Sequence, residues 1–141
     1  MVSEDKVSAL RLGLFRLARL LRRQNLDLSF SQTEFNILGL LGRRKNLLPS
    51  EIAQEEKISA QAISQNLNTM ERAGLISRQT DPGDRRKTVI SLSKTGLEIL
   101  DKVKHERDIW LLRAMEQKLT AEEREQLLAV APLLHKLTTE E

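Results

Sequence analysis

Apolar residues recur every three or four positions over most of the chain, which predicts a mainly helical protein. Helices are expected at residues 5–28, 31–42, 49–56 and 60–73, then over a long stretch after Gly96 and again after Thr120. Ser31–Glu34 and Thr120–Glu123 both fit a capping box at a helix start. Residues 75–78 and 88–92 are rich in β-branched and apolar side chains and predict the two strands of a hairpin. The expected fold class is therefore mainly α with a small β-hairpin.

The first predicted helix carries an apolar stripe with the 3-4-3-4 spacing of a helix that packs along a seam. The stripe consists of Val7, Leu10, Leu14, Leu17 and Leu21. The last helix has apolar positions that include Leu127 and Leu134, and Pro132 inside it is expected to bend it or to start a new turn. Two interpretations stay open for these surfaces: packing within one chain, or an interface between two chains, which we favour.

The helices at 49–56 and 60–73 are short and are separated by a sharp turn, the pattern of a helix-turn-helix. Ser59 is expected to cap the second helix, and Gly74 to end it in the left-handed conformation. Inward positions Ala62, Ile63, Leu67 and Met70 leave an outer face of Ala60, Gln61, Ser64, Gln65 and Asn68. This face carries no charge in its first two turns, whereas solvated helix faces usually favour lysine and glutamate. Small side chains let a helix enter a major groove, and carboxamides can pair with adenine, although an ordinary polar face is the alternative.

The predicted hairpin has a basic tip. Residues 81–84 suit a tight turn in which Pro82 fixes φ and Gly83 supplies a positive φ. Three basic residues follow directly, Arg85, Arg86 and Lys87. A narrow minor groove attracts arginine, and an acid at Asp84 is expected to hold one arginine in a fixed orientation. A merely solvated tip is the alternative, but the preceding helix-turn-helix favours DNA and predicts a winged helix.

The charge distribution agrees with this placement. The formal net charge is +3 and the pI about 9.4, but residues 77–94 carry five basic and two acidic side chains, whereas residues 98–141 carry seven basic and ten acidic ones. The basic excess therefore coincides with the hairpin. Cysteine is absent, which excludes disulfides, thiolate metal sites and a cysteine nucleophile. No apolar run is long enough to cross a membrane and no signal peptide is recognisable, so a cytoplasmic protein is expected.

Catalysis has little support in the sequence. There is no phosphate-binding loop, no GxSxG or HExxH motif, and no convincing pair of nucleophile and base. His105 and His135 are isolated, and the acid pairs 55–56 and 122–123 lie at helix ends, where capping and electrostatics explain them. We therefore expect no catalytic residues, no metal site, no cofactor and no enzymatic activity.

The segments SEIAQEEKISAQAISQNLNTMERAGLISR and DPGDRRKTVISLSKTG, flanked by long terminal helices, resemble the MarR family of bacterial and archaeal transcription regulators. The resemblance covers nearly the whole chain, and DPGDRR followed by LSKTG is its most specific part. It implies a homodimer whose first and last helices interlock, a recognition helix in each major groove and a wing tip at each minor groove. By this resemblance the DNA-contacting residues are Ser59, Gln61, Ser64, Gln65, Asn68, Arg85, Arg86 and Lys87, with Asp81 and Asp84 orienting the wing. The dimer interface would use Val7, Leu10, Leu14, Leu17, Leu21, Leu127 and Leu134.

The expected organisation is a dimerisation helix at 1–30, a winged helix-turn-helix at 31–96 and dimerisation helices at 97–141. The expected function is a dimeric, sequence-specific regulator of transcription, most often a repressor in this family, acting on a pseudo-palindromic DNA operator. Many members bind a small, often aromatic anion in a cleft between the dimer helices and the winged helix. Here that cleft would draw on the end of the first helix, Phe30, Phe35 and the start of the long helix after Gly96; the sequence identifies no such ligand. Position 65 is often arginine in the family and is Gln65 here, so no operator sequence carries over; Asn66 replaces a common aliphatic residue and is expected to loosen the recognition helix slightly. A protein-interaction module and a DNA binder without an effector are the alternatives.

Overall fold

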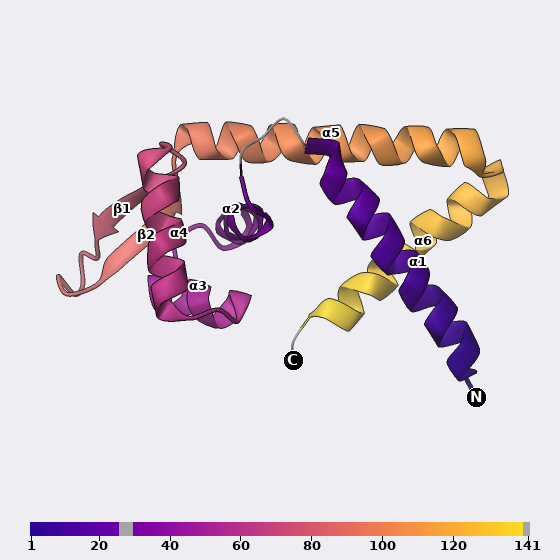
Figure 1. Cartoon of the computed structure of the whole chain (residues 1–141), viewed down its shortest axis with the longest axis horizontal. Coiled ribbons are helices and arrows are strands. Elements are labelled where there is room, and N and C mark those ends of the chain that lie inside the picture. The colour runs from indigo at the N-terminus through magenta and orange to yellow at the C-terminus, as the bar shows by residue number, and fades with distance from the viewer. Residues whose placement is uncertain (26–29, 140–141) are drawn as a thin grey trace. The chain divides into compact units, whose positions relative to one another are not determined.

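The computed structural model describes residues 1–25 and 30–139 (Figure 1). Within these ranges it contains six α-helices, one short 3-10 helix and a two-stranded sheet. The elements are α1 (Glu4–Arg22), η1 (Arg23–Asn25), α2 (Gln32–Arg44), α3 (Pro49–Glu56), α4 (Ala60–Arg72), β1 (Ile76–Thr80), β2 (Thr88–Leu92), α5 (Lys94–Lys118) and α6 (Ala121–Thr138). This order confirms the expected fold class of helices with one hairpin. Residues 26–28, the predicted end of the first helix, lie outside the described residues.

The chain forms two compact units. One is Leu26–Lys104, which holds α2, α3, α4, the hairpin and the first turns of α5, and which we call the winged-helix unit. The other combines Met1–Asn25 with His105–Glu141 and holds α1, η1, the rest of α5 and α6; we call it the terminal-helix unit. The three-part division at residues 30 and 96 concerns functional segments and stays a prediction.

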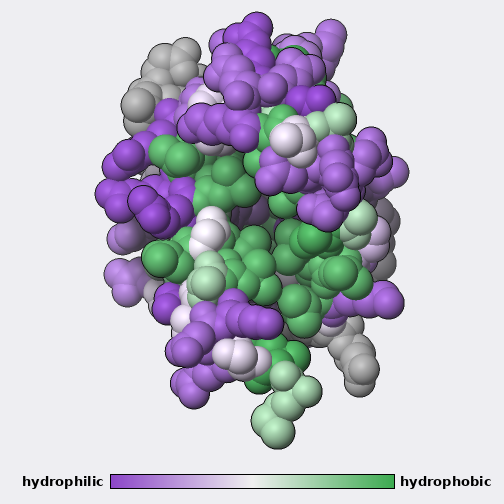
Figure 2. Space-filling model, turned by 90° about the vertical axis from the view of Figure 1, so that its right-hand side faces the viewer, coloured by the Kyte–Doolittle hydropathy of each residue, from purple (hydrophilic) through white to green (hydrophobic). Residues whose placement is uncertain are grey.

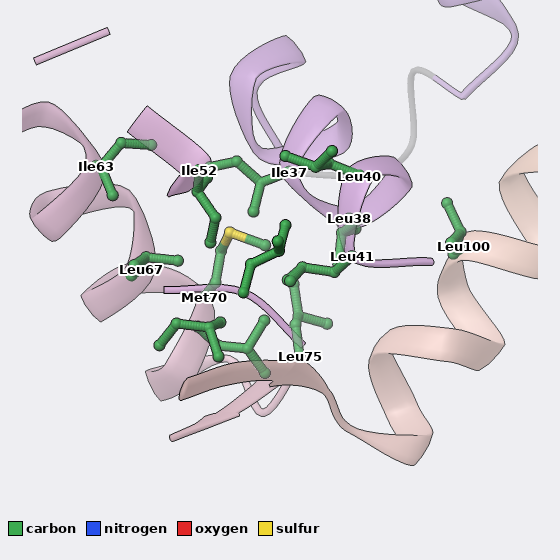
Figure 3. Close-up of a cluster of buried hydrophobic side chains, with 13 residues drawn as sticks. Ile37, Leu38, Leu40, Leu41, Ile52, Ile63, Leu67, Met70, Leu75 and Leu100 are labelled. Atoms are coloured by element: carbon green, nitrogen blue, oxygen red, sulfur yellow. The ribbon is translucent and has the colours of Figure 1, made fainter. Parts of the chain in front are cut away.

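The winged-helix unit is built around one aliphatic core. Figure 3 shows side chains of α2, α3 and α4 pointing toward one another around Met70. The largest fully buried side chains are Ile37, Leu38, Leu41, Ile52, Ile63, Leu67, Met70, Leu75 and Ile90. Each buried side chain of this size contributes about 1.5–3 kcal/mol, so this core supplies most of the free energy that holds α4 and the hairpin in place.

The boundaries of α4 follow the predicted local chemistry. Ser59 is the N-cap, and its Oγ accepts a hydrogen bond from the backbone N–H of Ala62 at 3.1 Å. Gly74 ends the helix at φ +76°, and two reverse bonds close the end, from Gly74 N–H to Glu71 O and from Leu75 N–H to Met70 O. This pair of bonds is the Schellman motif, in which glycine avoids the strain of a left-handed residue. Both predicted ends of α4 are confirmed.

The end of α2 differs from the prediction. The helix continues beyond Gly42 to Arg44, and Lys45 closes it with φ +65° and a bond from its N–H to Leu41 O. Arg43 and Arg44, which the predicted helix at 31–42 leaves out, therefore belong to the last helical turn. Arg44 forms an ion pair with Glu55 of α3, which ties the two helices together. The sequence pattern placed the end of the helix at Gly42, but glycine is also used where two segments pack closely. A Cβ at Gly42 would lie 2.6 Å from Leu100 Cδ2.

The hairpin strands pair in antiparallel register from Ile76 with Leu92 to Thr80 with Thr88. β1 is two residues longer at its outer end than predicted. A third segment joins them, because Leu47 and Ile90 exchange both backbone hydrogen bonds, at 3.0 and 2.7 Å. Leu47 and Ile90 are both buried, so this bridge fixes the base of the wing to the core. The outer end of the hairpin projects away from the helices (Figure 1).

The terminal-helix unit leaves large apolar side chains uncovered. Thr120 and Glu123 form the predicted capping box at the start of α6, and the bonds from Thr120 lower the pKa of the Glu123 carboxyl. Pro132 does not end α6, which continues to Thr138. Neither α1 nor α6 has a buried residue among those described. Figure 2 faces the side that carries these helices and shows a broad apolar area bordered by hydrophilic residues. No helix in the described part of the chain is long and apolar enough to span a membrane.

Candidate nucleic-acid interface

The outer face of α4 presents polar, uncharged side chains to solvent. Gln61, Ser64, Gln65 and Asn68 are all exposed, while Ile63, Leu67 and Met70 on the opposite side are at most 1% exposed. The helix therefore rests on the core through one stripe and leaves its other face free. Ser59, at the start of the same helix, is also exposed. The structure thus brings these five predicted contact residues together on one helix.

Asn66 lies between the two faces. It is half-buried, and its Nδ2 donates a hydrogen bond to Ala62 O, 2.8 Å away and one turn earlier. A polar residue at an otherwise apolar boundary position is thereby satisfied within the helix. The carboxamide of Asn66 is consequently engaged by the backbone, unlike those of the outer face.

The wing tip is built differently from the predicted turn. Gly83 does not have a positive φ, and the tight reversal lies at residues 84–87, where Lys87 N–H donates to Asp84 O at 3.0 Å. Asp81 closes the larger loop, because its N–H donates to Lys87 O and its Oδ1 accepts from Gly83 N–H. The aspartates supply the turn closure by accepting backbone N–H bonds, so glycine is not needed in a left-handed conformation.

This turn places Arg85 and Arg86 at its two central positions, and both are exposed. Asp84 Oδ1 accepts from the backbone N–H of Arg86 at 3.0 Å and from its Nε at 3.2 Å. These bonds, the backbone one first, lower the pKa of the Asp84 carboxyl. A lowered carboxyl pKa favours the ionised form, so the contact persists at neutral pH and weakens only as the pH falls through that lowered pKa. Lys87 is the last residue of the turn and is exposed as well.

One arginine that the sequence patterns did not single out also lies beside these residues. Arg78 of β1 reaches the outer side of α4, where its Nη2 donates to Asn68 Oδ1 at 2.7 Å and its Nε lies 3.4 Å from Glu71 Oε2. Strand periodicity could not predict this, because the target of Arg78 depends on the angle set by the turn at Gly74. The nearest signal in the sequence was that Arg78 is the one charged residue of β1, while Glu71 on α4 is exposed.

The predicted dimer residues lie on α1 and α6. Val7, Leu10, Leu14 and Leu127 are exposed, whereas Leu17, Leu21 and Leu134 are half-buried. Phe15 and Leu128, which also lie on these helices, are 64% and 59% exposed. Arg11 stacks over the Phe15 ring, 5.7 Å from its centre. Within residues 1–25 and 30–139, no group of three or more His, Cys, Asp or Glu side chains could hold a metal ion.

Comparisons with known proteins agree on one family. A model described as MarR family matches residues 26–87. An uncharacterised HTH-type transcriptional regulator of Mycobacterium leprae is 26% identical over 133 residues, which are 94% of this chain and 92% of that protein. The crystal structure of a protein from Pseudomonas aeruginosa, assigned as a transcriptional regulator, has a TM-score of 0.86 and 32% identity and covers 99% of this chain and 100% of that chain.

A further solved structure shows the same fold. It is a mutant of MepR from S. aureus bound to an oligodeoxyribonucleotide, with a TM-score of 0.71 and 21% identity over 98% of this chain and 100% of that chain. The helix-turn-helix, the wing and the long terminal helices thus recur at full length in solved regulators. The chain belongs to the MarR family of HTH-type transcriptional regulators.

Proposed function

We propose that the chain works as a homodimer that recognises a pseudo-palindromic DNA operator and represses transcription. One observation carries this proposal: a single compact unit combines an exposed helix face, uncharged over its first two turns, with an arginine-tipped wing. The first feature suits base reading and the second suits attraction to phosphates and to a narrow groove. The MepR mutant with the same fold is bound to an oligodeoxyribonucleotide, which supports DNA as the partner of this chain.

On the recognition helix, Gln61 and Gln65 would face base edges through their carboxamides, and Ser64 would let the backbone approach closely. Ser59 would contact phosphate near the helix start, where the free backbone N–H groups attract anions. On the wing, Arg85 and Arg86 would enter the minor groove, with Lys87 near the backbone. Phosphate and minor-groove contacts then supply affinity, whereas the α4 face supplies sequence choice.

Two recognition helices on one operator require a dimer, because each chain has one. The uncovered apolar side chains of α1 and α6 supply the interface, since single chains rarely expose apolar areas of this extent (Figure 2). Two recognition helices would then meet successive major grooves, about 34 Å apart along the duplex. A repressor of this kind competes with transcription by occupying its operator.

A small aromatic carboxylate is the effector that we propose. In the terminal-helix unit a hollow of about 330 Å³ is lined by Gln24, His105, Glu106, Ile109, Trp110 and Arg113. Trp110 offers an aromatic surface and Arg113 a fork for a carboxylate. Because α5 runs through both units, a ligand that favours one arrangement of the dimer would change the spacing of the two reading heads.

Benzoate is expected to quench the fluorescence of Trp110, the one tryptophan of the chain, and to weaken DNA binding over the same concentration range. Arg113→Gln should weaken benzoate binding about tenfold because a charge-assisted hydrogen bond is lost. Lys118→Gln removes the same charge from the same helix and should leave benzoate binding unchanged. Equal quenching in both variants would show that Arg113 does not hold the carboxylate.

Two substitutions test whether the wing supplies affinity and α4 supplies sequence choice. Arg86→Ala should weaken binding to all duplexes by a similar factor and reduce the salt dependence of the affinity, because a cation near phosphate is lost. Gln61→Ala should instead mainly relax preference at one base pair of each half-site, by about tenfold or less. Affinities for a duplex selected from random DNA, and for single-base variants of it, measure both effects across salt concentrations.

The same measurements separate DNA reading from the alternative of a protein-interaction module. A module for protein partners would show weak duplex binding with no selected sequence, and neither substitution would change it. Wild-type protein that selects a sequence, combined with unchanged binding by both variants, would place the reading face elsewhere on the chain.

A further inference from the structure

Asn68 differs from the other polar side chains on the outer face of α4 because it is held by a neighbour. Among the described residues, the side chains of Gln61, Ser64 and Gln65 make no hydrogen bond, whereas Asn68 Oδ1 accepts one from Arg78 Nη2 at 2.7 Å. Arg78 comes from β1, opposite Ile90 in the hairpin register, so the wing strand fixes a side chain of the recognition helix.

The polarity of the Asn68 carboxamide follows from this contact. Arginine carries only donors, so the amide atom that faces Arg78 must be the oxygen. The NH2 group of Asn68 therefore points away from Arg78. The amide of an unconstrained asparagine can rotate by about 180° to suit the base that it contacts. In the DNA-free protein, the contact with Arg78 already fixes which side of the Asn68 amide donates and which accepts.

Glu71 holds the other side of the same guanidinium. Its Oε2 lies 3.4 Å from Arg78 Nε, and the Arg78 side chain is 29% exposed. Asn68 and Glu71 are three residues apart on α4 and so share one side of the helix. The Glu71 contact is an ion pair in which Arg78 Nε makes no hydrogen bond within the described residues, so the bond to Asn68 is the directional one. Together the two contacts favour this position of Arg78 and offset part of its charge, so Arg78 is poorly suited to be simply a cation for phosphate.

We propose that Arg78 is a positioning residue that orients Asn68 to donate a hydrogen bond to an acceptor on the DNA. The inference rests on the proposed DNA-reading function of α4. Bidentate pairing with adenine needs both the oxygen and the NH2 group of an asparagine to face the base. With its oxygen turned to Arg78, Asn68 instead favours an acceptor: guanine N7 or O6, adenine N7 or thymine O4 in the major groove, or a phosphate oxygen.

Selection of bound duplexes from random DNA by the full-length protein, followed by affinities for single-base variants, tests this assignment. Asn68→Ala should lose preference at one position of each half-site if the acceptor is a base, and should weaken all duplexes equally if it is a phosphate. Arg78→Gln is neutral and carries both a donor and an acceptor. It should change the affinity that depends on this contact about tenfold, which is the lower range for one base contact. Arg78→Lys keeps a donor-only side chain and should restore much of the wild-type behaviour.

Matched controls isolate the role of Arg78 in orienting Asn68. Arg72→Gln removes the same charge from the exposed last turn of α4, and Glu71→Gln removes the ion pair but leaves the bond to Asn68. Both should preserve the selected sequence. In an Asn68→Ala background, Arg78→Gln should add no further change in preference, because its target is gone. Thermal unfolding of each variant checks that the winged-helix unit stays folded.

Additive effects of Arg78→Gln and Asn68→Ala, or a uniform loss of affinity with a reduced salt slope in Arg78→Gln alone, would overturn the inference and make Arg78 a phosphate contact. Failure of the wild-type protein to select any duplex would overturn the proposed function itself. Selection by the wild type, with both the sequence preference and the affinity unchanged in Arg78→Gln, would overturn the positioning role only.

Discussion

Gly96→Ala is expected to destabilise the winged-helix unit by about 3 kcal/mol or more, the upper range for overpacking a rigid site. A Cβ at Gly96 would lie 2.0 Å from the backbone oxygen of Leu75 and 3.0 Å from its carbonyl carbon. Leu75 is 1% exposed, and its oxygen also accepts a hydrogen bond from Ser93 N–H. Neither backbone can move without breaking this bond or displacing the core, so the strain cannot relax cheaply.

The close approach has a structural purpose. Ser93 Oγ donates to Gly74 O and accepts from Gly96 N–H, so one hydroxyl joins the end of α4 to the start of α5. Gly96 permits the first turn of α5 to lie directly against the residues that follow α4. The wing is thereby anchored at its return end as well as at the Leu47–Ile90 bridge. Loss of this junction would release the wing and α4 together.

Urea unfolding followed by circular dichroism measures the effect. Gly39→Ala is the matched control, because its Cβ would meet only the flexible end of Arg43 at 3.4 Å, and helix propensity predicts a gain of up to about 1 kcal/mol. Ser93→Ala should cost about 1 kcal/mol, as the loss of an N-cap does. A Gly96→Ala protein as stable as the wild type would refute the close contact with Leu75.

Local chemistry and periodicity were sufficient to predict most of the winged helix. Ile63, Leu67 and Met70 recur at helical spacing and are buried, and the cap at Ser59 and the left-handed Gly74 delimit the same helix. These features depend on residues within a few positions of one another, so the sequence alone encodes them. The family resemblance, whose most specific part is residues 81–96, added the expectation of a homodimer whose first and last helices interlock.

Features that depend on contacts between distant segments were not predictable in the same way. Gly42 marks packing against Leu100 rather than a helix end, and nothing near it in the sequence indicates the difference. The wing reverses at residues 84–87, where the Asp84 backbone oxygen accepts from Lys87 N–H and the Asp84 carboxylate accepts from Arg86 N–H. Arg78 meets Asn68 only because the turn at Gly74 brings β1 back across α4.

The double substitution Leu10→Glu and Leu14→Glu is expected to convert dimers into monomers and to weaken operator binding by about 10²–10⁴-fold, the range that linked half-sites contribute. Leu10 is 56% exposed and Leu14 37% exposed in the single chain, on the stripe of α1 that we assign to the interface. Burying a carboxylate in such a seam without a partner costs several kcal/mol per group, far more than a solvated glutamate on a free helix. Since neither side chain belongs to the core of the winged-helix unit, that unit should stay folded and retain weak, half-site binding.

Light scattering after size-exclusion chromatography measures the mass, and circular dichroism at the same concentration checks that the helices remain. Gln117→Glu with Gln126→Glu is the matched control, since these exposed, isosteric changes add the same two negative charges without removing apolar surface. It should remain dimeric and bind the operator nearly as well as the wild type. A dimer that survives Leu10→Glu and Leu14→Glu would mean that α1 does not form the seam, and the exposed leucines of α6 would then have to carry the interface alone. Loss of the dimer with unchanged operator affinity would instead mean that one recognition helix is enough for binding. That result would contradict the proposed binding of a dimer to a pseudo-palindromic operator.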